Sequence, residues 1–474
     1  SSNGRLTKTF GTVDSSVHWT LNFWIKRSAL GGTNPVGAVR PLDIFTPRSG
    51  TSGSVLNEMF FGATGSYGAG DAFVITNTNT GAYVLSTDNL FRDTSAWYNF
   101  HIQADLDNGT ASEKIKIFVN GTEVSYNVDN RGSFTSLAGF TAGAWTIGDY
   151  HGYGYPIQSY LAAWAYVDGY THPPTDFAES KNGVWIPKDL SSGITWGSAG
   201  HLLMFQDSSA LGDDTSGEGN DWAVANIAAH DQMLDSPTFN SNSNGGNMCT
   251  WNPLDAKNMA VPTEGNLSVD FSGSNYNQIR GTMSIGNSGK WYMELYKTNT
   301  YASYPAWGIC DQNQKLTASY TTPGYLAKAM AGIAWDFNAS KVYKSLTYSE
   351  SASGTEIGTT ANVYTNTAQI VGMAIDLDNN KIFTHVDGTW DSGCGNPSSG
   401  GSGFDASGLS GVNNLVPVVL PSSVNSPAYV LVGGFGADST FGGLTSAGSG
   451  TDVNGYGNFK YSVPTGYGAI CQGN

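Results

Sequence analysis

Short stretches of alternating apolar and polar residues recur along this chain, and each is bounded by a turn rich in glycine, serine or asparagine. Residues 18–26 show the pattern most clearly, because every second side chain is large and apolar: Trp19, Leu21, Phe23 and Ile25. A period of two places these side chains on one face of a β-strand. The alternation, with 61 glycines supplying the turns, therefore predicts antiparallel β-sheets and few helices.

Both halves of the chain carry the same arrangement of strands. Residues 97–107 and 114–121 read as two strands joined by a turn-rich loop. In the second half, 289–297 resembles the strand at 18–26, and 373–388 repeats the hairpin with a shorter turn. We therefore predict an all-β chain of two antiparallel β-sandwich domains of related design.

The alternation stops between residues 207 and 262, where Asp, Ser, Asn, Gly and Pro predominate. We predict domains at 1–206 and 263–474, joined by a long irregular connector at 207–262. Such a long irregular stretch is usually functional or packed along a domain surface. Trp222 and Met233 within it favour packing.

Charge and hydropathy exclude several classes of protein. The net charge is −16, from 22 Lys+Arg and 38 Asp+Glu, and the cations are scattered. A nucleic-acid partner and an anionic membrane surface both require a basic face, so neither is expected. No stretch approaches the roughly 18 apolar residues of a membrane span, so we expect a soluble chain without membrane insertion.

The four cysteines are spread through the second half of the chain without a CxxC pair: Cys249, Cys310, Cys394 and Cys471. This spacing is not that of a disulfide scaffold or a zinc site. We predict buried free thiols.

The ordered segments resemble a known pair of domains. HWTLNFWIKR, FRDTSAWYNFHIQAD, KIKIFVNGTEV and YLAAWAYVDGYTHPPTDFAE resemble the concanavalin A-like, laminin-G-type domain of marine tailed-phage proteins. DQMLDSPTFN, WNPLD, SGKWYMELY, VGMAIDLDNNKI, FGADSTFGG and NGYGNFKYSVPTGYGAIC are similar to the SPRY-type domain that follows it there. The resemblance spans nearly the whole chain, and it implies a virion-exposed fibre or appendage protein that engages the host surface. It does not identify the ligand.

An enzyme is not expected. The concanavalin A-like fold includes glucanases with paired carboxylates in an ExDxxE strand, and this chain has no such motif, no GxSxG elbow and no HExxH pair. The pairs Asp105/Asp107 and Asp376/Asp378 share a strand face, but each lies where a strand meets a turn. Aspartate at that position normally caps the turn. A glycan-degrading enzyme remains the third alternative for function.

Two acidic, glycine-containing loops are candidates for Ca²⁺, which binds several oxygen ligands. The residues are Asp207, Asp213, Asp214, Glu218 and Asp221 in the connector, and Asp452 and Asn454 near the end of the chain. Neither loop has the full DxDxDG spacing. The alternative is a solvated acidic loop without an ion.

Aromatic and polar residues in loops are candidates for glycan binding, because sugars bind to aromatic faces and hydrogen-bonding groups at the ends of β-sandwiches. They are Asp149, Tyr150, His151, Tyr153 and Tyr155 in the first half, and Tyr301, Tyr304 and Trp307 in the second. Alternatively, these aromatic side chains pack against neighbouring loops or a sister subunit.

These observations predict a non-enzymatic protein on the exterior of a phage particle that attaches to host-surface glycan. One shallow site binds a sugar weakly, so attachment requires several copies, and we expect a homo-oligomer in contact with other virion subunits. The negative charge favours neutral glycans. The alternative is a structural decoration or fibre module that binds no sugar.

Overall fold

The alternating stretch at the start of the chain forms strand β2 (His18–Arg27) at the centre of a sheet. The computed structural model describes residues 4–31, 42–49, 57–62, 70–77, 82–150, 156–237, 245–257, 262–271, 277–298, 305–316, 329–349, 354–361, 367–420 and 430–474. The chain divides into two units, Ser1–Gln232 and Met233–Asn474. Each unit has its own pair of sheets and its own core.

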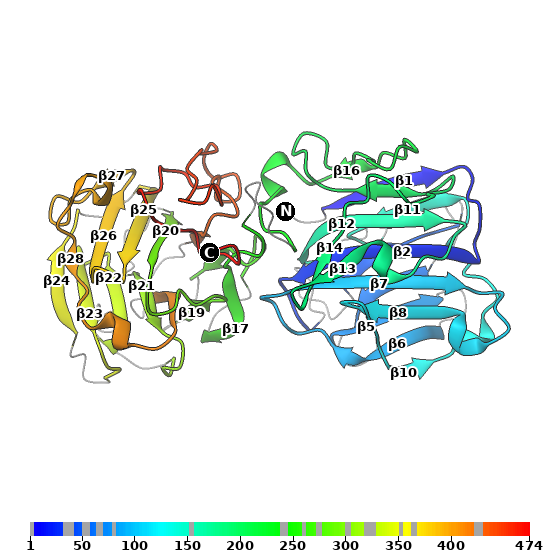
Figure 1. The fold of residues 1–474 in the computed structure, drawn as a ribbon, viewed down its shortest axis with the longest axis horizontal. Coiled ribbons are helices and arrows are strands. Elements are labelled where there is room, and N and C mark those ends of the chain that lie inside the picture. The colour runs from blue at the N-terminus through cyan, green and yellow to red at the C-terminus, as the bar shows by residue number, and fades with distance from the viewer. Residues whose placement is uncertain are drawn as a thin grey trace. The chain divides into compact units, whose positions relative to one another are not determined.

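The first unit is a sandwich of two antiparallel sheets (Figure 1). The larger sheet has the order β10 (Tyr126–Asp129), β6 (Ala82–Leu90), β5 (Ala72–Asn77), β4 (Asn57–Phe61), β3 (Leu42–Thr46), β11 (Gly143–Ile147), β1 (Arg5–Phe10), β16 (Ala223–Ala225). The smaller has the order β15 (His201–Leu203), β12 (Ser159–Asp168), β2, β7 (Trp97–Asp105), β8 (Ile115–Val119), β9 (Thr122–Glu123).

Aromatic side chains from both sheets fill the core of the first unit. Trp19, Phe23 and Trp164 from the smaller sheet meet Phe45 and Trp145 from the larger one, and all five are fully buried. The Phe23 and Trp164 rings stack with centroids 4.9 Å apart, and Phe45 meets Trp164 edge-on at 5.2 Å. Burying such rings supplies much of the apolar area that stabilises a sandwich.

A separate hairpin covers the outer face of the smaller sheet. Its strands are β13 (Ala178–Lys181) and β14 (Val184–Pro187). Trp24 and Trp97 point outward from the sheet, and they are nevertheless buried, because they pack with Ala178 and Trp185 of the hairpin. The Trp185 indole N–H donates to Asn99 Oδ1 at 2.9 Å.

The second unit is also an antiparallel sandwich. One sheet has the order β17 (Trp251–Lys257), β19 (Gln278–Gly281), β29 (Leu415–Leu420), β21 (Ala306–Asp311), β22 (Gly332–Asp336), β23 (Lys341–Ser345), β24 (Thr355–Thr359). The other has the order β18 (Ser268–Asp270), β30 (Val430–Gly434), β20 (Lys290–Lys297), β25 (Gln369–Asp376), β26 (Lys381–Val386), β27 (Thr389–Trp390), and β28 (Phe404–Asp405) also pairs with β26.

The all-β prediction is confirmed. Helical structure among the described residues is confined to short 3-10 turns such as η4 (Ala229–Asp231), apart from a single helical position at residue 329. No helix in the described part of the chain is long and apolar enough to cross a membrane. All four cysteines are buried, and none of them is joined to another in a disulfide, as expected.

The predicted connector at 207–262 is divided between the two units. Its first part contains β16, which pairs with β1 through Leu6 and Val224, and Trp222 packs in the core of the first unit. Its second part contains β17, which pairs with β19 in the second unit. The boundary at Gln232 and Met233 therefore lies inside the segment that the sequence marked as a connector.

Candidate functional site

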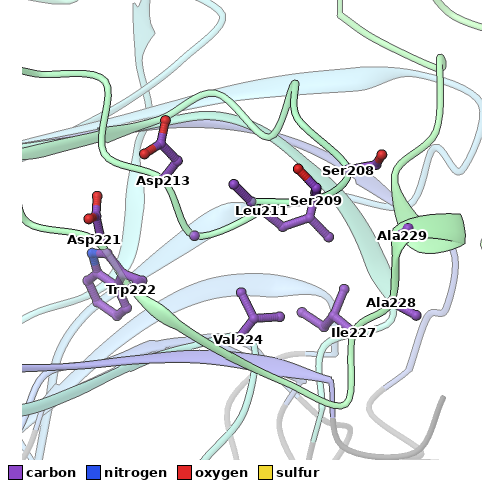
Figure 2. A pocket seen from close by; sticks show the side chains of 12 residues that line it. Ser208, Ser209, Leu211, Asp213, Asp221, Trp222, Val224, Ile227, Ala228 and Ala229 are labelled. Atoms are coloured by element: carbon purple, nitrogen blue, oxygen red, sulfur yellow. The ribbon is translucent and has the colours of Figure 1, made fainter.

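A pocket of about 460 Å³ opens on the first unit, between two segments of the predicted connector. We call it the 208–229 pocket. Figure 2 shows the turn at 208–213 on one side and the segment from Asp221 to Ala229 on the other. The lining residues are Ser208, Ser209, Ala210, Leu211, Gly212, Asp213, Asp221, Trp222, Val224, Ile227, Ala228 and Ala229.

The first wall is a turn that Asp207 fixes. One carboxylate oxygen of Asp207 accepts the Ser209 N–H at 2.8 Å and the Ser209 hydroxyl at 2.6 Å, and these bonds lower the pKa of Asp207. The chain then turns again, because the Asp213 N–H donates to the Ala210 carbonyl. Leu211 is thereby turned inward and buried.

The second wall is held by strand pairing and by the aromatic core. Trp222 is buried, with its ring 5.0 Å from that of His201 and 6.1 Å from that of Phe10. Burial lowers the pKa of His201 to about 4, so the imidazole in this core is neutral at pH 7. After β16, the Asp231 carboxylate accepts the Ala228 N–H at 2.7 Å and fixes the start of η4.

The two walls meet at Gly212. Its carbonyl accepts the Trp222 N–H at 2.8 Å. A Cβ atom at Gly212 would lie 1.9 Å from the Trp222 carbonyl oxygen, so only glycine allows this approach. No local sequence pattern predicts this contact, since the two residues are ten positions apart in an irregular segment.

The lining combines an apolar floor with a polar rim. Leu211, Val224 and Ile227 supply apolar surface, and Val224 is 40% exposed although it lies in a strand. Ser208 and Ser209 supply hydroxyl groups, and the exposed carboxylates of Asp213 and Asp221 supply hydrogen-bond acceptors. None of the twelve described residues that line the pocket is a lysine, arginine or histidine. This arrangement suits an uncharged, hydroxyl-rich ligand and disfavours an anion.

The first predicted calcium loop is a set of turn caps in the structure. Asp214 accepts from the N–H groups of Leu202, Ser216 and Asn220, and from the Ser216 hydroxyl, all within 2.9 Å. Asp221 accepts the Asp214 N–H at 3.0 Å. Glu218 is exposed. Because local donors occupy the Asp214 oxygens, the predicted grouping of Asp207, Asp213, Asp214, Glu218 and Asp221 around one ion does not form.

The second predicted calcium loop is occupied in the same way. Asp452 is buried and accepts from the N–H groups of Asn454, Tyr456 and Ala469. The Asn474 amide also donates to it, at 2.6 Å, and Asn454 donates to the Asn474 side-chain oxygen. Asp452 therefore closes the end of the chain onto its own loop, which corrects its assignment as a metal ligand.

The predicted glycan loop of the first half is only partly described. Asp149 has no exposed surface, so it is not available to a ligand at the surface, contrary to the prediction. Tyr150 is half-buried. His151, Tyr153 and Tyr155 lie outside the described residues.

Trp307 is a core residue and not a ligand-binding one. It lies in β21 opposite Trp335 of β22, and both side chains are fully buried. The prediction that Trp307 binds glycan is wrong because the other face of this sheet is also buried, around Cys310. The strand therefore lacks a polar face. Tyr301 and Tyr304 lie outside the described residues.

The paired aspartates lie at strand ends, as the sequence indicated. Asp376 caps its turn by accepting the Asn379 N–H at 2.9 Å, and it forms an ion pair with Lys290 at 3.1 Å. Asp378 accepts the Gly289 N–H. Asp105 accepts from the Asn108 amide, and both Asp105 and Asp107 contact His18.

Three buried polar side chains in the second unit are linked by hydrogen bonds, and no sequence pattern predicts this arrangement. Tyr292 lies between Glu294 and His385, with its hydroxyl oxygen 2.8 Å from Glu294 Oε1 and 2.7 Å from His385 Nε2. The Gly388 N–H donates to His385 Nδ1, so Nε2 carries the proton and donates to Tyr292, which donates to Glu294. Burial raises the pKa of Glu294 to about 7 and lowers that of His385 to about 3.

Neither a family model nor a curated protein matches the sequence. The solved structures that resemble the chain are distant. The SPRY domain of human HERC1 is 12% identical over 38% of this chain and 96% of its own, with a TM-score of 0.28. Domains LG4-5 of the mouse laminin α1 chain are 11% identical over 91% of this chain and 86% of theirs, with a TM-score of 0.27.

The carbohydrate recognition domain of Emp46p, in its potassium-bound form, is 9% identical over 39% of this chain and 88% of its own, with a TM-score of 0.28. The similar structures thus include SPRY and laminin-G domains, the two types that the sequence resembles. Their TM-scores are too low to support an argument about function, which therefore rests on the pocket.

Proposed function

We propose that this chain is a non-enzymatic surface protein of a phage virion that attaches to host-cell glycan, and that the 208–229 pocket binds a neutral sugar. The resemblance of the ordered sequence segments to tailed-phage proteins supports the virion setting. The observation that supports sugar binding is the lining of the pocket, where the described residues place hydroxyl and carboxylate groups around an apolar floor and include no cationic side chain.

The chemistry of a sugar matches this lining. A pyranose has hydroxyl groups at its edge and C–H groups on its faces. The Asp213 and Asp221 carboxylates can accept hydrogen bonds from the hydroxyl groups, while Leu211, Val224 and Ile227 cover the C–H face. Hydrogen bonds to charged groups are stronger than those between neutral groups, so the carboxylates set the orientation of the sugar.

We propose that the pocket binds the sugar without hydrolysing it. Both carboxylates of the pocket are exposed at its rim. Glycoside hydrolysis requires one carboxylic acid kept protonated by its surroundings, usually by burial against apolar groups. A reducing-sugar assay with the bound glycan should therefore detect no product.

The pocket is open, so each site is expected to bind weakly, with a Kd from about a millimolar to tens of micromolar. Useful attachment then depends on several copies on one particle, and we propose a homo-oligomer that contacts other virion subunits. The net charge of −16 opposes binding of acidic polysaccharides.

The test is binding of clustered protein to host-cell envelopes and to an array of neutral and acidic glycans. Asp213→Asn replaces one pocket carboxylate by a neutral amide of nearly the same size. Glu218→Gln is the matched control, because Glu218 lies exposed in the same loop but does not line the pocket. We expect Asp213→Asn to weaken binding of a neutral glycan about tenfold or more, and the control to bind like the unchanged protein.

Two outcomes would contradict the proposal. Equal binding by Asp213→Asn and the unchanged protein, with loss in a Tyr150/Tyr153/Tyr155 triple alanine variant, would move the site to the tyrosine loop. The absence of binding by any form, even when clustered, would favour a structural decoration or fibre module.

A further inference from the structure

At one end of the smaller sheet of the first unit, an imidazole and two carboxylates converge. His18 Nε2 lies 3.2 Å from Asp105 Oδ1 and 2.9 Å from Asp107 Oδ1. The three potential ligand atoms all lie within 4.8 Å of one another, the one such group of three among the described residues. We propose that His18, Asp105 and Asp107 bind a divalent transition-metal ion, a site distinct from the 208–229 pocket and independent of the proposed function.

The spacing fits coordination to a single ion. Zinc–nitrogen and zinc–oxygen bonds of about 2.0 to 2.2 Å place two ligand atoms roughly 3.4 Å apart at the tetrahedral angle that zinc prefers. The two distances from His18 Nε2, 3.2 and 2.9 Å, are slightly shorter than that value. An ion can therefore enter between the three groups with small side-chain movements.

Paired strands and a neighbouring hydrogen bond hold these ligands in position. His18 begins β2 and Asp105 ends β7, and the two residues are directly paired across the strands. Outside the group, the Asn108 amide holds the second oxygen of Asp105 at 2.9 Å, which leaves Oδ1 facing His18. Such hydrogen bonds from neighbouring residues orient metal ligands and raise affinity.

The two carboxylates of the group favour a bound cation. The ligand oxygens of Asp105 and Asp107 lie within 4.8 Å of each other. Among the described residues, no lysine or arginine forms an ion pair with either of them, so one imidazole faces two negative charges. A divalent ion would neutralise both carboxylates and use the neutral form of the imidazole.

The donor set selects the class of ion. One imidazole nitrogen and two carboxylate oxygens suit Zn²⁺ or Mn²⁺, whereas Ca²⁺ prefers a site made of oxygens alone. His18 and Asp105 are about one-third exposed, and Asp107 is 65% exposed. Exposure gives the ion an entry path and leaves coordination positions open to water or to a ligand oxygen.

The test is titration of the chelator-treated full chain with Zn²⁺ by calorimetry and with Mn²⁺ by electron paramagnetic resonance. We expect one saturable site per chain for Zn²⁺ or Mn²⁺ that a tenfold excess of Ca²⁺ does not displace. Asp107→Asn should weaken binding at least about tenfold, and His18→Ala should abolish it. His172→Ala is the matched control, because His172 pairs with a single carboxylate, Asp176, at 2.9 Å.

The proposal fails if the unchanged chain shows no saturable site for either ion, since the group is then only a surface ion pair. It also fails if Asp107→Asn binds as tightly as the unchanged chain. Asp107 is mostly exposed, so this variant is expected to fold even where His18→Ala does not. Circular dichroism of each variant checks the fold.

Discussion

Glu294 shows how one buried residue can control the pH dependence of stability. Its carboxylate accepts the Lys460 and Tyr461 N–H groups at 2.8 and 2.9 Å, and it thereby fixes the segment near the end of the chain against β20. These bonds lower its pKa, but desolvation by burial is the larger effect and raises the pKa from 4.5 to about 7. The groups that face it, besides these N–H groups, are the Tyr292 hydroxyl and the charge of Lys460.

The sign of the resulting effect follows from linkage. The folded chain binds the Glu294 proton more tightly than the unfolded chain, so this residue stabilises the fold fully below pH 4.5. That contribution is lost as the pH rises from 4.5 to about 7. Glu294→Gln cannot ionise, so we expect its free energy of unfolding to fall less steeply over this range than that of the unchanged protein.

Denaturant unfolding at several pH values between 4.5 and 7.5 measures this difference in slope. Glu218→Gln serves as the control, because Glu218 is exposed and the same charge is removed. Parallel pH profiles for Glu294→Gln and the unchanged protein would show that Glu294 ionises alike in both states.

At the scale of single elements, the sequence predicted the central strands well. The stretches at 18–26 and 289–297 correspond to β2 and β20, and the hairpin at 373–388 corresponds to β25 and β26. These strands each have a buried face in the core, and a buried face produces alternation that can be read locally.

The elements that depend on distant partners could not be predicted. Strand β16 has three residues and forms because it pairs with β1, where Val224 lies opposite Leu6, 218 positions earlier in the sequence. The outward residues Trp24 and Lys26 look like surface positions in the sequence, yet both are buried. The pocket is unpredictable for the same reason: the sequence predicts Asp213 and Asp221 as calcium ligands, and the two walls of the cavity meet through the contact between Gly212 and Trp222.

Substitutions in the β13–β14 hairpin test whether its packing over the smaller sheet stabilises the first unit. Trp185→Ala removes the ring that packs over Trp24 and Trp97, and it leaves the buried Asn99 without its indole donor. We expect a loss of about 2 to 3 kcal/mol in the free energy of unfolding, below the cost for a fully buried tryptophan because Trp185 is half-buried.

Trp185→Phe separates the two effects. It keeps a ring over the cluster but removes the donor to Asn99, so we expect a loss of about 1 kcal/mol. Denaturant unfolding followed by tryptophan fluorescence measures both variants. Equal stability of Trp185→Ala and the unchanged protein would mean that the hairpin does not stabilise the first unit.

At the scale of the whole molecule, the two units have separate cores, and the boundary between them decides which fragments can fold. A fragment of residues 1–232 keeps β16 and Trp222 on the first core, whereas a fragment of residues 1–206 loses both. Removing Trp222 uncovers the rings of Phe10 and His201. We therefore expect 1–232 to unfold cooperatively and 1–206 to be less stable by about 3 kcal/mol or more.

Thermal and denaturant unfolding of the two fragments checks this expectation. The fragment of residues 233–474 is the companion measurement, because it contains β17 and the whole second core. Equal stability of 1–206 and 1–232 would show that the segment at 207–232 is a linker after all.

The central claim is that a neutral glycan binds between the two segments of the 208–229 pocket. Hydrogen exchange of the backbone amides, measured with and without a bound neutral oligosaccharide, tests it most directly because it locates the ligand on the chain. We predict slower exchange in residues 208–213 and 221–229 when the sugar is present, and a smaller change there in Asp213→Asn at the same sugar concentration. Protection confined to residues 148–160, or to the second unit, would contradict the claim.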